Sequence, residues 1–252
     1  MEAKPLDAFF KPQAVAVVGA SHREEAVGHV LVRNLKMGGF PGRIHPINPK
    51  GGEILGLKVS PGLGDIGEAV DLAVICIPIG GVPEVIRECG RLGIKAALII
   101  SAGGKEAGEE GLAMDAAIHE AAAAGGVRYF GPNCMGLLCP ESGLNASFAA
   151  FAAAPGNIAF ISQSGALGSA ILGWAIQNKI GFSHFISVGT MADLDFADLI
   201  DYLGDEPKAK SILIYMEGLK NHRRFMSAAR AVSRIKPLET GYRPGRAPEA
   251  PV

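Results

Sequence analysis

The stretch ISQSGALGSAILGW, residues 161–174, places Ser164 where an apolar run turns directly into a helical pattern. A serine at such a turn is either a nucleophile, as in hydrolases, or part of a backbone cradle for an anion. A nucleophile elbow has glycine two residues before the serine, and here that residue is Ser162. The histidines after Ser164 are His184 and His222, and neither lies in a context that suits a catalytic triad. The residues therefore favour a cradle over a nucleophile.

Backbone donors at the start of this helix make the turn a candidate phosphate site. A strand, a Ser-Gln-Ser-Gly turn and a helix aim free N–H groups and the positive end of the helix dipole at an anion. The two small hydroxyls of the turn can add hydrogen bonds to phosphate oxygens. The candidate phosphate-binding residues here are Ser162, Gln163, Ser164 and Gly165.

The stretch GPNCMG, residues 131–136, has a similar turn composition. Asn133 can hydrogen-bond a phosphate, and we include it among the phosphate-binding candidates. An interdomain turn without a ligand is the alternative interpretation of the same residues. Cys134 would need a nearby base to act as a nucleophile, and the sequence shows none.

A second glycine turn lies near the N-terminus, in VVGASHREEAVGHVLVRNL at residues 17–35. It has the strand, turn and helix that place phosphate at a helix N-terminus, although Ser21 stands where a G-x-G-x-x-G motif has its second glycine. An ordinary tight turn is therefore also consistent with it. The candidate ligand-binding residues of this region are Gly19, Ala20, Ser21, Gly28, Asn48 and Lys50.

The end of the next apolar run discriminates between ligands. A fold that binds NAD has Asp or Glu there, to bind the ribose diol. This sequence has INPKGG, with Asn48 and Lys50. A lysine suits a phosphorylated ribose, as in NADP or coenzyme A, whereas a solvated surface lysine is the alternative. NAD is disfavoured.

Three further apolar runs end in residues that could pack on an adenine or bind polar atoms of a ligand. Because ligands of open α/β sheets bind beyond the carboxyl ends of the strands, these residues are candidates as well. A carboxylate at such an end, as in YMEG, can hold an imidazole in one tautomer, or it can merely cap the next helix. The candidates are Ile77, Pro78, Ser101, Ala102 and Gly103 for ligand binding and Glu217 for catalysis.

Apolar runs and helical patterns alternate in two series, which predicts parallel sheets covered on both faces. In the first series, strands at 14–20, 43–49, 71–78, 96–103 and 127–133 alternate with helices at 25–39, 83–93 and 111–126. In the second, strands at 157–162, 183–189 and 210–216 alternate with helices at 165–179, 195–204 and 221–235. A doubly wound sheet has a further strand after the last helix, and Pro, Gly and Arg dominate that part of the sequence instead.

Composition limits the class of protein. The chain has 252 residues, 48% of them hydrophobic and 19% charged, so we expect a sizeable core. A net charge of −1 argues against a nucleic-acid or membrane-surface partner. The N-terminus lacks an apolar signal core and the apolar runs are too short to span a membrane, so we expect a cytoplasmic protein. The spacing of the four cysteines does not complete a metal site, and we expect none.

Several short motifs occur in one order across residues 9–237, and their combination is specific. They are GAS with VLVRNL, INPKGGEILG, SAGGKE, GPNCMGL, ISQSGALG and SVGTMADLDFADLIDYL followed by YMEG. Together they resemble the α subunit, or N-terminal half, of the ADP-forming acyl-CoA (acetyl-CoA) synthetases, which are relatives of succinyl-CoA ligase.

The resemblance implies a reaction and the roles of several residues. The reaction is acyl-CoA + phosphate + ADP to acid + CoA + ATP, through an acyl phosphate and a phosphohistidine. Gly19 to Ser21, Lys50 and Ser101 to Gly103 fall on the family's CoA site, and the helix after Ser164 receives the phosphate of the phosphohistidine. Glu217 matches the glutamate that orients this histidine. The resemblance also implies an ATP-grasp β subunit or domain as partner, and an oligomer.

The expected fold is α/β, a Rossmann-type CoA-binding domain followed by an incomplete flavodoxin-like succinyl-CoA-ligase domain. We expect the first domain at 1–130, a linker with the GPNCMG loop at 131–155, the second domain at 156–237 and a disordered tail at 238–252.

The family's phosphate-accepting histidine lies in a stretch that resembles Ser-His-Thr-Gly, and this sequence has no such stretch. We therefore expect a CoA-binding α-type subunit that is inactive as a ligase in this form. A non-catalytic CoA-binding module is the alternative. An NADP-binding oxidoreductase is a third interpretation, which depends on Lys50 alone.

Overall fold

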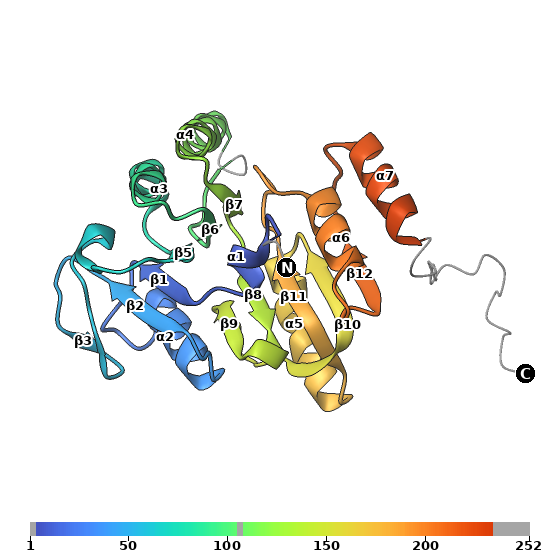
Figure 1. The fold of residues 1–252 in the computed structure, drawn as a ribbon, viewed down its shortest axis with the longest axis horizontal. Coiled ribbons are helices and arrows are strands. Elements are labelled where there is room, and N and C mark those ends of the chain that lie inside the picture. Colours follow the sequence, from blue (N-terminus) through green and yellow to red (C-terminus); the bar gives the residue numbers. More distant parts are fainter. Residues whose placement is uncertain (1–3, 105–107, 234–252) are drawn as a thin grey trace, which may run out of the picture.

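A computed structural model describes residues 4–104 and 108–233, and Figure 1 shows them as two sheets side by side, with helices packed against each. The first sheet is entirely parallel, with the strand order β2-β1-β5-β6-β7. Every residue of β1, β5 and β6 is buried, which explains why these strands are continuous apolar runs and do not alternate. The strands are β1 (Ala14–Val18), β2 (Arg43–Ile47), β5 (Leu72–Ile75), β6 (Ala96–Ile99) and β7 (Arg128–Phe130).

Helices cover both faces of this sheet. The helix α2 (Val27–Met37) packs Leu31 and Leu35 in one core with Val15, whereas α3 and α4 pack in a second core on the opposite face. Successive strand residues point to opposite faces, so each of these strands contributes to both cores. The remaining elements here are α3 (Val82–Arg91), α4 (Glu109–Gly125), the hairpin β3 (Glu53–Ile54) and β4 (Leu57–Lys58), and the 3-10 turns Leu63–Asp65 and Ile79–Gly81.

The second sheet is mixed, with the strand order β12-β10-β11-β8-β9. The first three of these strands are parallel to one another. Strand β8 pairs antiparallel with β11, and β9 pairs antiparallel with β8. Helix α5 packs on one face, and α6 and α7 pack on the other. The elements are β8 (Gly136–Cys139), β9 (Leu144–Ser147), β10 (Ala154–Ser162), α5 (Gly165–Gln177), β11 (Gly181–Ser187), α6 (Phe196–Gly204), β12 (Ser211–Tyr215) and α7 (His222–Ser233), with a 3-10 turn at Pro140–Ser142.

The segment 131–155, which we expected to be a linker with the GPNCMG loop, contains regular secondary structure. It contains β8 and β9, which pair with each other and extend the second sheet beside β11. All residues of both strands are buried, so they lack the alternation that marks a half-buried strand. Long-range pairing, which a local pattern does not encode, creates this hairpin. The division of the chain into domains at residue 131 stays a prediction.

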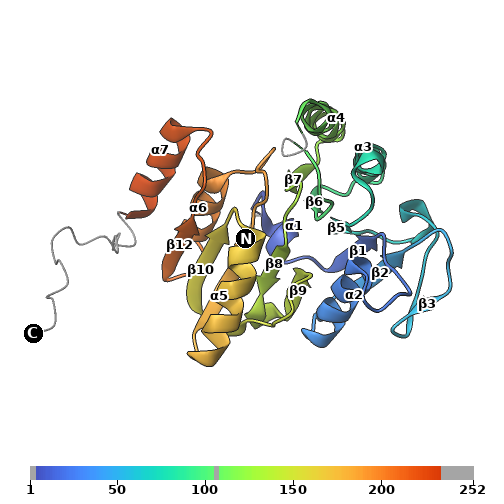
Figure 2. The ribbon, with the colours of Figure 1, turned by 180° about the vertical axis from the view of Figure 1, so that it is seen from behind.

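The short helix α1 (Asp7–Phe10) lies between the two sheets, as both ribbon views show (Figures 1 and 2). The ring centroid of Phe9 lies 4.9 Å from that of Phe130 in β7. The ring centroid of Phe10 lies 4.8 Å from that of Tyr202 in α6 and 5.3 Å from that of His184 in β11. Both phenylalanines are buried, so α1 joins the core of one sheet to that of the other.

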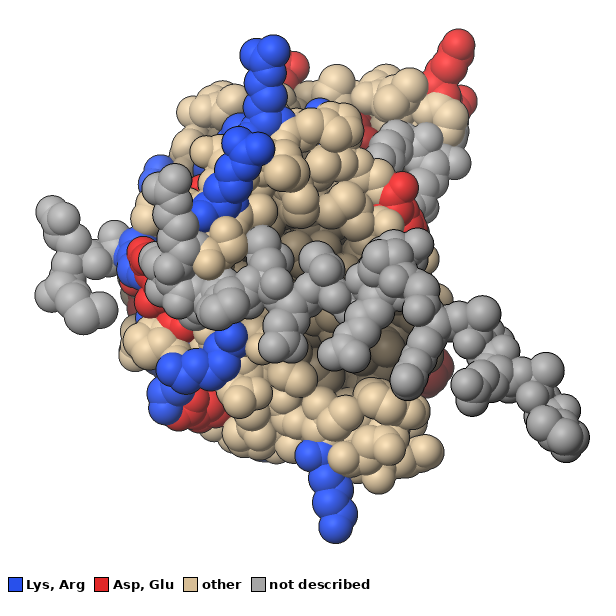
Figure 3. All heavy atoms as spheres, turned by 90° about the vertical axis from the view of Figure 1, so that its right-hand side faces the viewer, with Lys and Arg blue, Asp and Glu red and all other residues tan. Residues whose placement is uncertain are grey.

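The distribution of charged side chains on the surface agrees with the small net charge. Figure 3 views the side that carries α7, where Lys and Arg side chains project at separate places, with Asp and Glu among them. On the part of this face that the described residues form, the basic side chains do not gather into one continuous surface. Within 4–104 and 108–233, no helix is both long and apolar enough to cross a bilayer. The expected tail at 238–252 lies outside the described residues.

We predict that Phe10→Ala destabilises the fold by about 3 to 5 kcal/mol, because it removes a buried ring that contacts elements of the second sheet. Phe151→Ala is the matched control, since Phe151 is 48% exposed and its truncation should cost about 1 kcal/mol or less. Urea denaturation followed by circular dichroism measures both changes. Equal midpoints for the two variants would show that α1 does not hold the sheets together.

Candidate functional site

The first glycine turn needs its glycines because backbone segments approach closely there. Gly19 has φ +95°, and a Cβ built on it would lie 2.7 Å from the carbonyl oxygen of Cys76. A Cβ on Gly28, at the start of α2, would overlap the carbonyl oxygen of Gly19. The two glycines thus let α2 begin directly against the loop that leaves β1. This brings the N-terminus of α2 to the carboxyl end of the parallel strands.

A cavity of about 480 Å³ lies at this loop. It brings together five of the residues that the sequence pointed to, together with two charged residues, Arg23 and Glu25, that it missed. Their position in the sequence, between the glycine turn and the start of the helix, could have identified these two residues. The cavity is lined by Gly19, Ala20, Ser21, Arg23, Glu25, Ala26, Val27, Gly28, Asn48 and Cys76.

Asn48 connects the end of β2 to the glycine loop. Its side-chain nitrogen Nδ2 donates to the carbonyl oxygen of Ala20 at 2.7 Å, and its Oδ1 accepts from the backbone N–H of Lys50 at 2.9 Å. The amide of Asn48 is therefore engaged within the protein and shapes the loop. Lys50 itself is exposed, at the turn that this bond fixes.

The other strand-end candidates continue from this cavity. The side chain of Ile77 lies beside Gly19, since a Cβ on Gly19 would come within 2.9 Å of it, and Pro78 is exposed next to it. Gly103 lies against Ile79, with 3.1 Å between a Cβ built on Gly103 and Cγ1 of Ile79. The structure thus places the ends of β5 and β6 side by side, as parallel strands with neighbouring positions require.

Ser101 links these loops to the GPNCMG loop. The residue is 6% exposed, and its carbonyl oxygen accepts from the backbone N–H of Asn133 at 3.0 Å. Ala102, the next residue, is exposed. Asn133 adopts φ +56°, a left-handed conformation that asparagine tolerates better than most residues. The candidates at 101–103 and at 133 therefore adjoin each other.

The turn before α5 is shaped by its own side chains. The Oγ of Ser164 accepts from the N–H of Leu167 at 3.3 Å, so Ser164 is the N-cap of α5. The Oγ of Ser162 accepts from the N–H of Ser164 at 3.1 Å and donates to its carbonyl oxygen at 2.9 Å. Both hydroxyls thus hold the turn. The N–H groups of Gly165 and Ala166 lie in the first helical turn, where no intrahelical acceptor exists.

Gln163 connects this turn to the end of β12. Its Oε1 accepts from the backbone N–H of Glu217 at 2.5 Å and from that of Gly218 at 2.9 Å. The carboxylate of Glu217 is on an exposed residue beside the turn. Gln163 is therefore a structural link, and Glu217 is the side chain here that is free to face solvent. The arrangement can hold an anion at the backbone with a carboxylate nearby.

The loop 131–136 lies beside the turn before α5. A Cβ built on Gly165 would be 3.7 Å from the Cβ of Met135, and the Oγ of Ser169 lies 3.3 Å from Sδ of Met135. The N–H of Met135 also donates to Oγ of Ser187 at 3.0 Å, at the end of β11. The two loops that we expected to bind phosphate are thus neighbours in the fold.

The side chains of the described histidines and cysteines do not offer a nucleophile at this turn. His184 is 6% exposed and packs against Phe10, and His222 is exposed at the start of α7. Burial raises the pKa of the Cys134 thiol to about 12, and its Sγ donates to the carbonyl oxygen of Ile99. A thiol with such a pKa stays protonated at neutral pH. In the described part of the chain, no three or more His, Cys, Asp or Glu side chains group to hold a metal ion.

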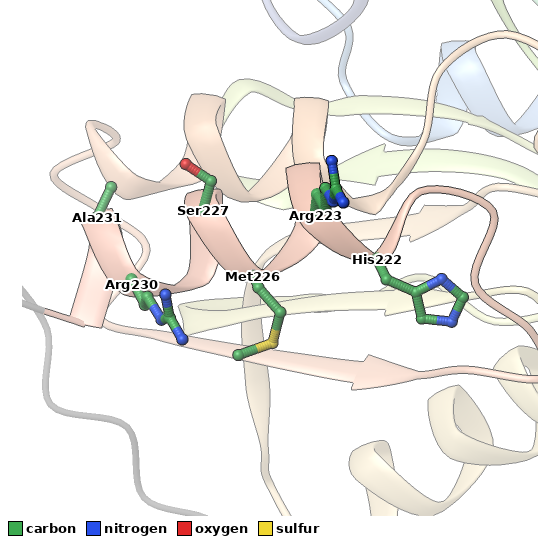
Figure 4. Close-up of a pocket in the computed structure, with 6 residues that line it drawn as sticks. All are labelled: His222, Arg223, Met226, Ser227, Arg230 and Ala231. Carbon is green, nitrogen blue, oxygen red and sulfur yellow. The ribbon is translucent and has the colours of Figure 1, made fainter.

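A larger hollow, of about 630 Å³, lies along α7. Figure 4 shows its lining side chains on successive turns of this one helix. Strand ends contribute none of its described lining, and the lining has no acid. It therefore lacks the convergence of backbone donors and polar groups that marks the glycine-loop cavity. The described lining is His222, Arg223, Met226, Ser227, Arg230 and Ala231.

Comparisons with known proteins agree with the two-part fold. Residues 13–140 match the family described as CoA binding domain, and residues 155–249 match the succinyl-CoA ligase like flavodoxin domain. The α subunit of ADP-forming acetate–CoA ligase I from Pyrococcus furiosus is 45% identical over 237 residues, which are 92% of this chain and 51% of the relative. The α subunit of ligase II from the same organism is also 45% identical, over 92% of this chain and 50% of its own length.

A solved structure gives the same result. The dinucleotide-forming acetyl-coenzyme A synthetase 1 of Candidatus Korarchaeum cryptofilum, in complex with phosphate and ADP, superposes with a TM-score of 0.89 at 42% identity, over 92% of this chain and 50% of that one. The chain thus spans about half the length of the relatives it matches. It belongs to the CoA-binding domain family, joined to a succinyl-CoA ligase-like flavodoxin domain, and is a relative of the α subunits of ADP-forming acetate–CoA ligases.

Proposed function

We propose that this chain is the CoA-binding, α-type part of a nucleoside-diphosphate-forming acyl-CoA ligase, which converts acyl-CoA, phosphate and ADP to acid, CoA and ATP. One observation carries the proposal: the glycine loop, the N-terminus of α2 and the end of β2 enclose one cavity, and a lysine follows the strand where NAD-binding folds have an acid. The family of relatives supports CoA over NADP as the phosphorylated ligand.

In this proposal the parts of CoA bind to different loops. The diphosphate binds at the glycine loop and the N-terminus of α2, where backbone N–H groups and the helix dipole favour negative charge. Lys50 binds the 3′-phosphate, and Ile77 with Pro78 packs on the adenine. The residues 101–103 lead the remainder of the ligand toward Asn133 and thus toward the second loop cluster.

The turn before α5 binds phosphate in the same proposal. Gly165 and Ala166 provide backbone donors, and Glu217 occupies the position whose carboxylate would orient a phosphate-carrying histidine. No histidine of this sequence lies in the family's motif, and His184 is buried against Phe10. The chain therefore binds CoA and phosphate but does not carry out phosphoryl transfer by itself, and an ATP-grasp β subunit or domain supplies the nucleotide site.

The first experiment tests the ligand. We predict that Lys50→Glu raises the Kd for CoA about tenfold, because a charge-assisted contact to the 3′-phosphate becomes repulsive. The Kd for dephospho-CoA should change by less than about threefold, since that ligand lacks the 3′-phosphate. Isothermal titration calorimetry measures both, with Lys210→Glu as a control of equal charge change at another exposed lysine. Tight binding of NAD together with no binding of CoA would overturn the proposal.

The second experiment tests the geometry of the cavity. We predict that Gly28→Ala weakens CoA binding at least tenfold, because the added Cβ overlaps the carbonyl oxygen of Gly19 and displaces the loop. Gly80→Ala is the matched control, since a Cβ built there meets no atom within 4 Å. Its Kd for CoA should stay within about twofold of the parent value. If Gly28→Ala bound CoA like the parent, the cavity would not be the site.

The third experiment tests the phosphate site. We predict that Gly165→Pro weakens inorganic phosphate binding about fivefold, because it deletes one N–H donor at the first helical position, which tolerates proline. Ser164 has ψ 116°, which suits a residue before proline, so α5 should be retained. Phosphate titrations followed by the amide NMR shift of Ala166 give the affinity, and far-UV circular dichroism checks the helix. Unchanged phosphate affinity with an intact helix would refute this assignment.

A further inference from the structure

Two consecutive carbonyl groups of the glycine loop are held by side chains. The carbonyl oxygen of Ala20 accepts from Nδ2 of Asn48 at 2.7 Å, and that of Ser21 accepts from Nδ1 of His29 at 2.9 Å. Asn48 comes from the end of β2, and His29 comes from the first turn of α2. The carbonyls of the loop are thus bound from two different elements.

Holding these carbonyls determines where the N–H groups point. In a planar trans peptide, the C=O of one residue and the N–H of the next point in opposite directions. The bond to Ala20 therefore turns the N–H of Ser21 away from Asn48, and the bond to Ser21 turns the N–H of His22 away from His29. Ser21 lines the cavity of about 480 Å³. The N–H of Arg23 is bound at 3.1 Å by Oγ of Ser21, which further fixes the turn.

His29 acts on this loop from inside the protein. Its side chain is 8% exposed, and it does not belong to the described lining of the cavity. A carbonyl oxygen only accepts, so Nδ1 of His29 carries the proton in this bond. Gly28, the residue before it, touches the backbone of Gly19, so the ring is fixed close to the loop that it binds. His29 thus contacts the loop through the carbonyl oxygen of Ser21.

We infer that His29 is a positioning residue of the CoA site: together with Asn48, it holds the carbonyls of Ser21 and Ala20 so that the loop presents its N–H groups to the diphosphate. This inference rests on the proposed function, which it deepens. It assigns anion recognition to the backbone of the loop and the orientation of that backbone to two side chains. Without the bond from His29, the peptide after Ser21 is free to rotate and can turn its carbonyl toward the anion.

The test compares two substitutions of His29. His29→Leu removes the donor but keeps a buried, helix-compatible side chain, whereas His29→Asn keeps a donor, because Nδ2 of asparagine lies about where Nδ1 of histidine does. We expect His29→Leu to weaken CoA and dephospho-CoA by the same factor, on the order of tenfold, since both ligands carry the diphosphate. His29→Asn should stay within about threefold of the parent. Calorimetry measures the affinities of the parent and of both variants for the two ligands.

Amide hydrogen exchange of Ser21 and His22 without ligand supplies a second readout. Exchange should be faster in His29→Leu and close to the parent in His29→Asn. Asn48→Asp, which sets a carboxylate against the carbonyl of Ala20, should weaken binding in the same way as His29→Leu. If the parent binds no CoA, the proposed function fails. The exchange rates still show whether His29 holds the peptide after Ser21. If the parent binds CoA and His29→Leu binds it equally well, the role of His29 is refuted.

Discussion

The backbone contact between the loop 131–133 and the turn after β11 is the interaction on which the rest of the structure depends. The N–H of Gly131 donates to the carbonyl oxygen of Val188 at 3.3 Å, and the N–H of Thr190 donates to that of Pro132 at 3.0 Å. Gly189 has φ +57°, and a Cβ there would overlap the carbonyl oxygen of Pro132, so the two backbones touch. These contacts place the carboxyl end of β7 against that of β11.

These hydrogen bonds bring together the loops that carry the two candidate anion-binding turns. The glycine loop follows β1 in the first sheet, and the α5 turn follows β10 in the second. Ser101 and Asn133 lie between them, through the hydrogen bond from the N–H of Asn133. In the proposed function, CoA bound at the glycine loop extends along these residues toward the second turn. The aromatic contacts of α1 support the same arrangement, since Phe9 and Phe10 pack on different sheets.

Both turns use one physical strategy. Each turn precedes a helix whose first backbone N–H groups are the proposed anion donors, and side chains hold the backbone of the turn in place. In the first turn these side chains are Asn48 and His29, and in the second they are Ser162 and Gln163. Polar residues that look like ligand-binding groups in the sequence thus form hydrogen bonds within the protein. Such bonds keep the donors oriented before the ligand arrives, which lowers the entropic cost of binding.

The sequence by itself determined the alternating α/β pattern, the glycine turn after the first strand and the strand-to-helix turn at Ser164. These features are local: continuous apolar runs, glycine at a strand end and a serine before a helix each describe backbone within a few residues. The motif order also pointed to the correct family. Its expectations about domain limits, individual site residues and location stay predictions.

Tertiary structure decided which distant groups meet. Asn48 and Ala20 are 28 residues apart, and Gln163 and Glu217 are 54 apart, so no local pattern pairs them. The pairing of β8 and β9 within a stretch that looks like a linker has the same cause. Hydrogen bonds between remote loops depend on how sheets and helices pack, and packing is a property of the whole chain. The residue types of the candidate site were therefore visible in the sequence, whereas the hydrogen bonds that orient them were not.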